Sequence, residues 1–234
     1  MEGGLRMKIE PRRTGETAKE YAYRILRDNI ASLELEPGSA ISDVEISQMI
    51  GISRTPVREA IIKLKEESGI IEIFPQRGMR VALIDPEVVQ EVRFLRVTLE
   101  KAVAEQACEL AREEDFAWFG ENLALQEFYL KSNLPERMIE LDDALHRRLF
   151  VICRKELIYR MSQGLAIHFD RVRSLEAVAA FHTAKTVEDH KNLVQAIRDR
   201  DKERARQVME THLDQWLVNQ QRLKERYPQY FKAD

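Results

Sequence analysis

The sequence contains no run of about 18 apolar residues, so it predicts no membrane-spanning helix. The opening MEGGLRMKIE lacks the apolar stretch of a secretory signal, which leads us to expect a cytoplasmic protein. Cysteine is scarce: Cys108 and Cys153 lie far apart and match no metal-binding spacing, so we expect buried free thiols. The motifs HExxH and GxSxG and a Gly-rich phosphate loop are also absent, which argues against several common classes of enzyme.

A strong charge of either sign is lacking as well. The formal net charge is −3, and within residues 1–84 the 13 lysines and arginines are balanced by 13 acidic residues. Residues 54–65 nevertheless hold four cations and one glutamate, a local excess of +3. A local excess is expected where a single element touches phosphates and base edges. With 234 residues, 44% of them apolar, the chain is large enough for two globular domains.

Residues 17–84, after a tail at 1–16, predict three helices. The first is indicated by apolar residues at helical spacing, namely Ala22, Ile25, Leu26, Ile30 and Leu33. Ser42 and Glu45 form the pattern of a capping box, which opens a short second helix that Gly51 closes. Ser53 can cap the third helix, where Pro56 in the first turn costs no backbone hydrogen bond. The tight turn between the last two helices predicts a helix-turn-helix.

The stretch IIEIFPQRGMRVALI follows these helices and predicts a β-hairpin. Two runs rich in β-formers flank a turn at 75–78 that contains proline and glycine. Three helices followed by a hairpin constitute a winged helix-turn-helix, which we expect over residues 17–84.

Residues 85–234 predict a second, all-α domain. Asp85 is placed as an N-cap and Pro86 as the first helical residue. Further amphipathic segments cover about 114–132, 135–153, 156–180, 184–199 and 202–226. We therefore expect a mostly α-helical protein with an N-terminal winged helix-turn-helix and a C-terminal antiparallel six-helix bundle.

The stretches LEPGSAISDVEISQMIGISRTPVREAIIKL and PQRGMRVAL resemble the DNA-binding domain of the GntR superfamily of bacterial transcription regulators. The remainder resembles the all-helical effector domain of the FadR subfamily, in its shorter, VanR-like six-helix form. The resemblance spans nearly the whole chain and implies a DNA-binding regulator rather than an enzyme. It also implies ligand binding and dimerisation by residues 85–234.

In this family the recognition helix enters the major groove and the wing reaches the minor groove. The resemblance places the DNA contacts at Arg54, Thr55, Pro56, Arg58, Arg77 and Gly78. Arginine is the commonest reader of guanine, and helix N-termini and hydroxyls favour phosphate, so the residue types agree with these roles. The alternative is that Arg54 and Arg58 belong to an ordinary solvated helix face.

Asp142, His146, His190 and His212 form a second constellation. Asp142 and His146 are four residues apart and so share one helix face. The midpoint between His190 and His212 is residue 201, within the RDRD turn. Two antiparallel helices joined there would carry each histidine roughly 16 Å along its helix at 1.5 Å per residue, and therefore to the same level.

One carboxylate and three imidazoles suit a divalent transition metal, with Zn(II) or Ni(II) favoured and Mn(II) as a further candidate. The alternative is a set of hydrogen-bonded core histidines. The Asp-x3-His…His…His pattern is similar to the metal site of the FadR-type domain, which implies that these residues are metal ligands here. His168 and His182 match no ligand position; we expect His182 at the surface.

A small organic acid is the expected effector, because a metal with open coordination positions binds carboxylates and an arginine can pair with the anion. The expected effector-binding residues are Arg96, Glu100, His168 and Arg171; as arginines for the anion, Arg171 and Arg173 are weaker candidates than Arg96. We expect a homodimeric repressor that reads double-stranded DNA with an inverted-repeat operator. The alternatives are a regulator for which the metal itself is the signal and a metal-dependent hydrolase fused to a winged helix.

Overall fold

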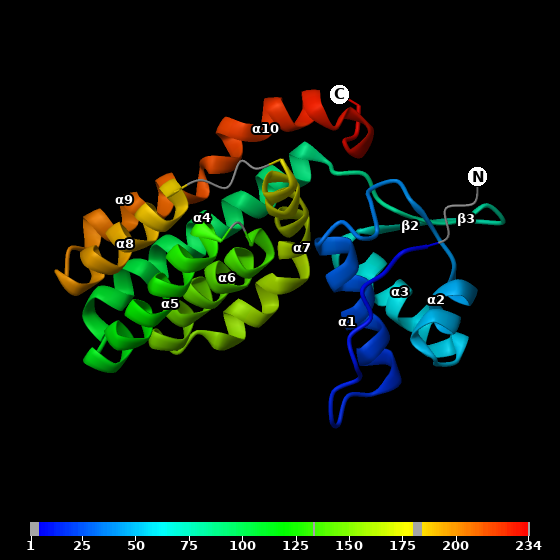
Figure 1. Ribbon diagram of the computed structural model, residues 1–234, viewed down its shortest axis with the longest axis horizontal. Helices are drawn as coiled ribbons and strands as arrows, with labels where there is room; N and C mark the ends of the chain where they lie inside the picture. The colour runs from blue at the N-terminus through cyan, green and yellow to red at the C-terminus, as the bar shows by residue number, and fades with distance from the viewer. Residues whose placement is uncertain (1–4, 133, 180–183, 234) are drawn as a thin grey trace. The chain divides into compact units, whose positions relative to one another are not determined.

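The computed structural model describes residues 5–132, 134–179 and 184–233, and its elements are drawn in Figure 1. The chain forms two compact units. The first comprises Met1–Val89, Gly164–Val172 and Lys224–Asp234, and the second comprises Gln90–Gln163 and Arg173–Leu223. The contacts thus group residues 164–172 and 224–234 with the first unit, in addition to the residues predicted for it. His182 lies outside the described residues.

The first unit contains the predicted winged helix-turn-helix. Its elements are α1 (Ala18–Ala31), β1 (Ala40–Ile41), α2 (Asp43–Ile50), α3 (Arg54–Ser68), β2 (Ile71–Phe74) and β3 (Gly78–Val81). The strands form an antiparallel sheet in the order β1-β3-β2, and Phe74 pairs with Gly78 at the end of the hairpin. The short β1 was not predicted, because two residues carry too little pattern to identify a strand.

Apolar faces of the three helices meet the base of the hairpin in one core. Its members include Ile25, Leu26 and Ile30 of α1, Ile46 of α2, Val57, Ile61 and Leu64 of α3, and Ile71 and Val81 of the sheet. Leu33 does not continue the α1 face as expected: the helix ends at Ala31, and Leu33 has a φ of 64°. Burial of each of these large apolar side chains stabilises the fold by about 1.5–3 kcal/mol, and it fixes which face of α3 is exposed.

Most of the residues predicted to start or end these helices do so. Gly51 and Gly69 close α2 and α3 with φ of 68° each, a conformation that favours glycine. The Ser42 hydroxyl accepts the backbone N–H of Glu45. Ser53 occupies the N-cap position of α3, but its side chain makes no capping hydrogen bond. The N–H groups at the start of α3 are therefore not capped by Ser53.

The helices after residue 85 are α4 (Pro86–Leu110), α5 (Glu113–Lys131), α6 (Pro135–Ile152), α7 (Glu156–Val178), α8 (Ala184–Arg198), α9 (Lys202–Leu213) and α10 (Gln215–Arg226), followed by a 3₁₀ turn, η1 (Pro228–Tyr230). Asp85 accepts the backbone N–H of Glu87, as expected of an N-cap. The segment 202–226, predicted as one helix, is divided at Asp214, whose side chain pairs with Arg93 of α4.

The second unit has a separate core that aligns the helices carrying the histidines. It contains Ala104 and Ala107 of α4, Phe119 of α5, Leu145 and Leu149 of α6, Leu193 of α8 and Met209 of α9. Cys108 and Cys153 are free and buried there, as predicted. Among the helices of the described residues, none is both long enough and apolar enough to cross a bilayer.

Candidate functional site

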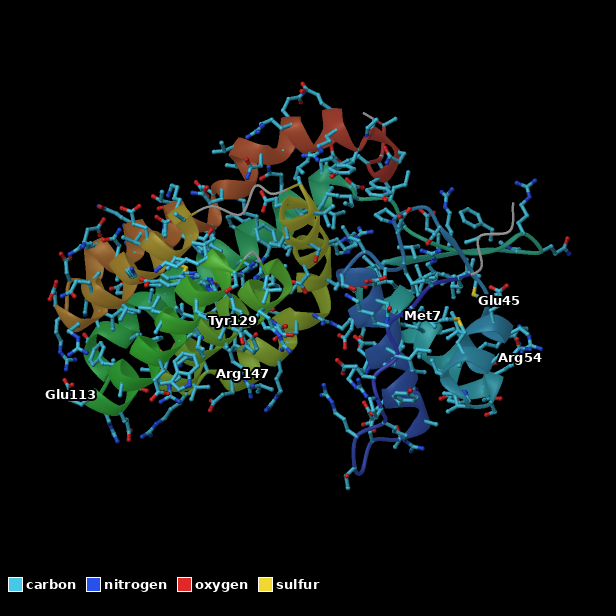
Figure 2. The ribbon with its side chains drawn as sticks, viewed as in Figure 1. Met7, Glu45, Arg54, Glu113, Tyr129 and Arg147 are labelled. Carbon is cyan, nitrogen blue, oxygen red and sulfur yellow. The ribbon has the colours of Figure 1, made fainter. Side chains whose placement is uncertain are left out.

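The first turns of α3 present two arginines on one exposed face. The side chains of Arg54 and Arg58 are 55% and 67% exposed, and Figure 2 shows Arg54 at the surface of the winged-helix unit. Thr55 is exposed beside them, whereas Val57 is fully buried and fixes the rotation of the helix. Pro56 lies in the first turn, as predicted. The α3 N-terminus therefore offers cationic side chains and a hydroxyl to a polyanion.

Asp43 holds both arginines, and sequence reasoning did not identify it. Its Oδ2 lies 3.2 Å from Nη2 of Arg54 and 2.7 Å from Nε of Arg58, while its own side chain is only 9% exposed. A carboxylate shared by two guanidinium groups restricts the rotamers of both arginines. The only signal in the sequence is the position of Asp43 in the first turn of the preceding helix.

The wing tip lies at the β2–β3 turn. Gln76 and Gly78 have φ of 60° and 99°, and the Arg77 N–H closes the turn on the carbonyl of Phe74. Arg77 is exposed at the tip. Between this hairpin and α3 lies a groove of about 610 Å³ that Arg58 lines. The structure therefore places the predicted DNA-contacting residues on α3 and on the wing of the same unit.

The second unit brings Asp142, His146, His190 and His212 together. Asp142 and His146 come from α6, His190 from α8 and His212 from α9, and one potential ligand atom from each lies within 4.8 Å of all the others. The rings of His190 and His212 are 4.6 Å apart between centroids. The turn between α8 and α9 contains Arg200, whose φ is 61°, and Asp201 caps the N-terminus of α9. The two histidines are thus level, as the spacing predicted.

The Nε2 atoms of the histidines face the carboxylate of Asp142. The distance from Nε2 of His190 to Oδ1 of Asp142 is 3.2 Å, and the corresponding distance for His212 is 3.8 Å. Nε2 of His146 lies 3.8 Å from Oδ2 of Asp142 and 3.2 Å from Nε2 of His212. All four side chains are thus aimed at one point.

The Nδ1 atoms face other partners. Nδ1 of His146 contacts Glu100, which also accepts Nε–H of Arg96 at 2.7 Å. Nδ1 of His190 lies 2.7 Å from Oε1 of Gln126. Nδ1 of His212 is 3.9 Å from Oδ2 of Asp189. Arg96 and Glu100, predicted from the sequence, therefore lie beside the cluster.

Arg173 reaches the cluster from α7. Its Nη2 lies 2.5 Å from Oδ2 of Asp142, and its Nη1 lies 2.6 Å from Oδ1 of the half-exposed Asp143. Of the two weaker arginine candidates, Arg171 and Arg173, it is Arg173 that contacts Asp142 directly.

The charges of the cluster follow from this burial and pairing. Burial opposes ionisation of Asp142, but Arg173 and His146 hold its pKa well below the usual value. Burial, together with the neighbouring His190 and His146, lowers the pKa of His212 to about 4. At neutral pH Asp142 is therefore a carboxylate and His212 a neutral imidazole, which are the protonation states that bind metals. Burial opposes a charge on His146, but the carboxylates of Glu100 and Asp142 raise its pKa, so a metal would have to displace a proton from His146.

The residues fit a divalent transition metal. Nε2 of His190 is buried without a hydrogen-bond partner. Two nitrogens bound to one ion at about 2.1 Å each stand roughly 3–3.4 Å apart, comparable to the 3.2 Å between the Nε2 atoms of His146 and His212. Three imidazoles with one carboxylate suit Zn(II), Ni(II) and Mn(II). Nε2 of His190 has the Asp142 carboxylate 3.2 Å away but no hydrogen bond of good geometry, which favours a ligand role over a hydrogen-bonded core histidine.

His168 and Arg171, also predicted to bind effector, have their contacts in the first unit. Nε2 of His168 donates to the Ser68 carbonyl at 2.6 Å. The fully buried Arg171 donates to the carbonyls of Ala82 and Leu83. Neither contact involves the histidine cluster. Both residues lie on α7, a helix of 23 residues whose two ends are assigned to the second unit.

We expect His168 to make the stability of the first unit depend on pH. Burial and the nearby Arg171 lower its pKa to about 4, and its Nδ1 has no partner. The unfolded chain binds this proton near pH 6.5, so the contribution is complete above pH 6.5 and declines as the pH falls towards 4. At pH 5 the loss is about 2 kcal/mol.

The measurement is urea unfolding of wild type and His168→Gln at pH 7 and pH 5. Glutamine retains a donor for the Ser68 carbonyl but does not titrate. The wild type should lose about 2 kcal/mol more than the variant between the two pH values. Equal losses would show that His168 is not held neutral.

Comparisons with known proteins identify the family of each part of the chain. Residues 18–81 match the family of bacterial regulatory proteins, gntR family, and residues 91–215 match the FCD domain. The chain belongs to the GntR family. Its C-terminal part is an FCD domain, as in regulators of the FadR type. It is therefore a bacterial helix-turn-helix transcriptional regulator rather than an enzyme.

Relatives of this GntR-family regulator match over most of its length. An HTH-type transcriptional regulator in an unstable DNA locus of Streptomyces ambofaciens is 32% identical over 94% of this chain and 92% of its own. The HTH-type transcriptional repressor RspR of Escherichia coli is 30% identical over 92% of this chain and 94% of its own. The solved structure of Escherichia coli McbR/YncC has the same fold, with a TM-score of 0.76, 20% identity and coverage of 90% and 99% of the two chains.

Proposed function

We propose that this GntR-family regulator is a repressor that holds a divalent transition metal at Asp142, His146, His190 and His212. A small carboxylate effector bound at that metal would change the affinity of the winged helix for its operator. The observation that supports this is the convergence of four potential ligand atoms within 4.8 Å. When bound, the metal supplies positive charge and open coordination positions, with Zn(II) or Ni(II) favoured and Mn(II) also suitable.

The pairing of charges around the cluster favours an anionic effector. Asp142 is already paired with Arg173, and Glu100 with Arg96. Asp189 is likewise paired with Lys185 at 2.8 Å. Among the described residues around the cluster, the buried carboxylates of Asp142, Glu100 and Asp189 thus each have a cationic partner already, and burying the uncompensated charge of a divalent cation is costly. A small organic acid at the open coordination positions would offset it, with Arg96 and Arg173 on hand to orient its carboxylate.

The proposed regulation acts on a homodimer at an inverted-repeat operator, because a two-fold protein requires a two-fold site. Effector binding would shift operator affinity by a coupling free energy of about 1–3 kcal/mol, or about 5- to 150-fold. Relief of repression is the expected direction, and the relative RspR carries the name of a repressor.

A thermal-shift screen of metal-analysed protein against small organic acids tests this proposal. An acid at 100 times its dissociation constant should stabilise the protein by about 2.7 kcal/mol. The shift should disappear after a chelator removes the metal and return when Zn(II) is restored. Metal lost on simple dialysis, together with DNA binding that follows metal concentration, would instead indicate the metal as signal. Protein purified and reconstituted without any bound metal would contradict the proposal.

A further inference from the structure

A chain of buried amides leads from a backbone carbonyl to His190. Nδ2 of Asn122 donates to the Leu141 carbonyl at 3.1 Å. Nε2 of Gln126 donates to Oδ1 of Asn122 at 2.7 Å, and Oε1 of Gln126 lies 2.7 Å from Nδ1 of His190. Asn122, Gln126 and His190 are at most 4% exposed. The three links connect α5, α6 and α8.

The direction of every hydrogen bond in this chain is fixed by its first member. A carbonyl oxygen only accepts, so Asn122 must turn its NH₂ group towards Leu141 and its oxygen towards Gln126. Gln126 must then offer its NH₂ group to Asn122 and its oxygen to His190. If Gln126 were turned around, two oxygens would face each other at hydrogen-bond distance. Nδ1 of His190 therefore carries a proton, so Nε2 is the nitrogen that can offer a lone pair to a metal.

We propose that Asn122 and Gln126 are positioning residues, which hold the ring of His190 and its Nε2 lone pair towards the centre of the Asp142 cluster. This inference rests on the proposed metal site. Neither residue is itself a proposed metal ligand: Gln126 contacts Nδ1 of His190, and Asn122 contacts Gln126. With Nδ1 engaged by Gln126, Nε2 is left facing Oδ1 of Asp142 at 3.2 Å, without a hydrogen bond of good geometry.

The three histidines differ in how Nδ1 is held. His146 faces the carboxylate of Glu100, whereas the carboxylate nearest to His212 is 3.9 Å from Nδ1. His190 alone among them faces a neutral amide whose orientation is fixed by a backbone group. Partners of this kind typically change metal affinity by about 10- to 100-fold when removed. The same range is expected for loss of the Gln126 oxygen.

The test compares Gln126→Leu, which removes the acceptor, with Gln126→Glu, which retains one. Zn(II) affinity is measured by competition with a chelator. Gln126→Leu should bind about 10- to 100-fold more weakly than wild type, and Gln126→Glu should recover only part of the loss, because its second oxygen faces Oδ1 of Asn122. A purely structural role would lower the stability of both variants without separating them in this way.

The ring tautomer is measured in metal-free protein by ¹⁵N NMR of the histidine side chains at pH 8. His190 should carry its proton on Nδ1 in wild type and Gln126→Glu, and should become a mixture of tautomers in Gln126→Leu. His146 should keep its tautomer throughout and serves as an internal control. Because no metal is present, this result does not depend on the proposed function.

The outcomes separate the two proposals. One outcome is wild-type protein that binds no Zn(II) but shows the Nδ1–H tautomer of His190, which is lost in Gln126→Leu. It would support the positioning role of Asn122 and Gln126 and contradict the proposed metal site. An unchanged tautomer in Gln126→Leu, or Zn(II) affinity equal to wild type, would overturn the inference. If Gln126→Leu does not fold, Asn122→Ala takes its place: it leaves Gln126 free to turn, and the same mixture of tautomers is expected.

Discussion

Arg58→Ala should abolish specific operator binding while leaving the second unit and its metal content unchanged. Arg58 is two-thirds exposed on the first turns of α3 and is oriented by Asp43. A bidentate contact between arginine and guanine is worth about 1–3 kcal/mol. With one recognition helix on each half of an inverted repeat, the loss is expected to double, which corresponds to at least roughly 30-fold in affinity.

The matched control is Lys63→Ala. Lys63 lies on the same helix and is also exposed, but it pairs with Glu67 and stacks over Tyr23, away from the α3 N-terminus. Both variants remove one positive charge, so the general attraction to DNA falls equally. Binding to an operator obtained by random-sequence selection is compared with binding to random DNA. Equal losses in the two variants would refute the placement of Arg58 at base edges.

The fold was predictable where local chemistry and tertiary packing agree. Gly51 and Gly69 end helices because they adopt left-handed φ, and the buried stripe of α3 leaves its arginines outside. The break at Asp214 was not predictable. Nothing in the residues around it stops a helix; the division coincides with a pairing to Arg93, which is 121 residues away in sequence.

The histidine cluster was predictable because the geometry of a helix hairpin constrains it. The turn at Arg200 makes α8 and α9 antiparallel, and equal spacing from that turn brings His190 and His212 to one level. That these residues bind a metal stays a prediction. The convergence itself agrees with the spacing and with the one-turn separation of Asp142 and His146.

The partners of the predicted residues were not predictable. Asp43 contacts Arg54 and Arg58, and Gln126 contacts His190, because of how neighbouring helices are rotated about their axes. A helical repeat shows which face is apolar, but not which polar residue of another helix meets it. The same limitation explains why the sequence could not tell which of Arg171 and Arg173 contacts Asp142.

Asp142→Ala should remove the metal and, with it, the response to an organic acid. Asp142 supplies the only carboxylate of the cluster, and its loss leaves three neutral donors for a divalent cation. Metal affinity should fall by more than about 100-fold, beyond the effect of losing an outer partner. The stabilisation of about 2.7 kcal/mol by a saturating acid, a shift of roughly 5–10 °C, should vanish with it.

Asp143→Ala is the matched control for this result, since it removes the adjacent carboxylate, which also contacts Arg173 but is half exposed. Asp142→Asn serves alongside, because it retains the volume of the side chain; truncating one partner of a buried pair costs about 3–5 kcal/mol by itself. Melting temperatures of the metal-free wild type and variants measure that destabilisation separately from the effect of losing the metal ion. Bound metal and an acid-induced shift that persist in Asp142→Asn would mean that the carboxylate charge is not needed, and that the histidines alone form the site.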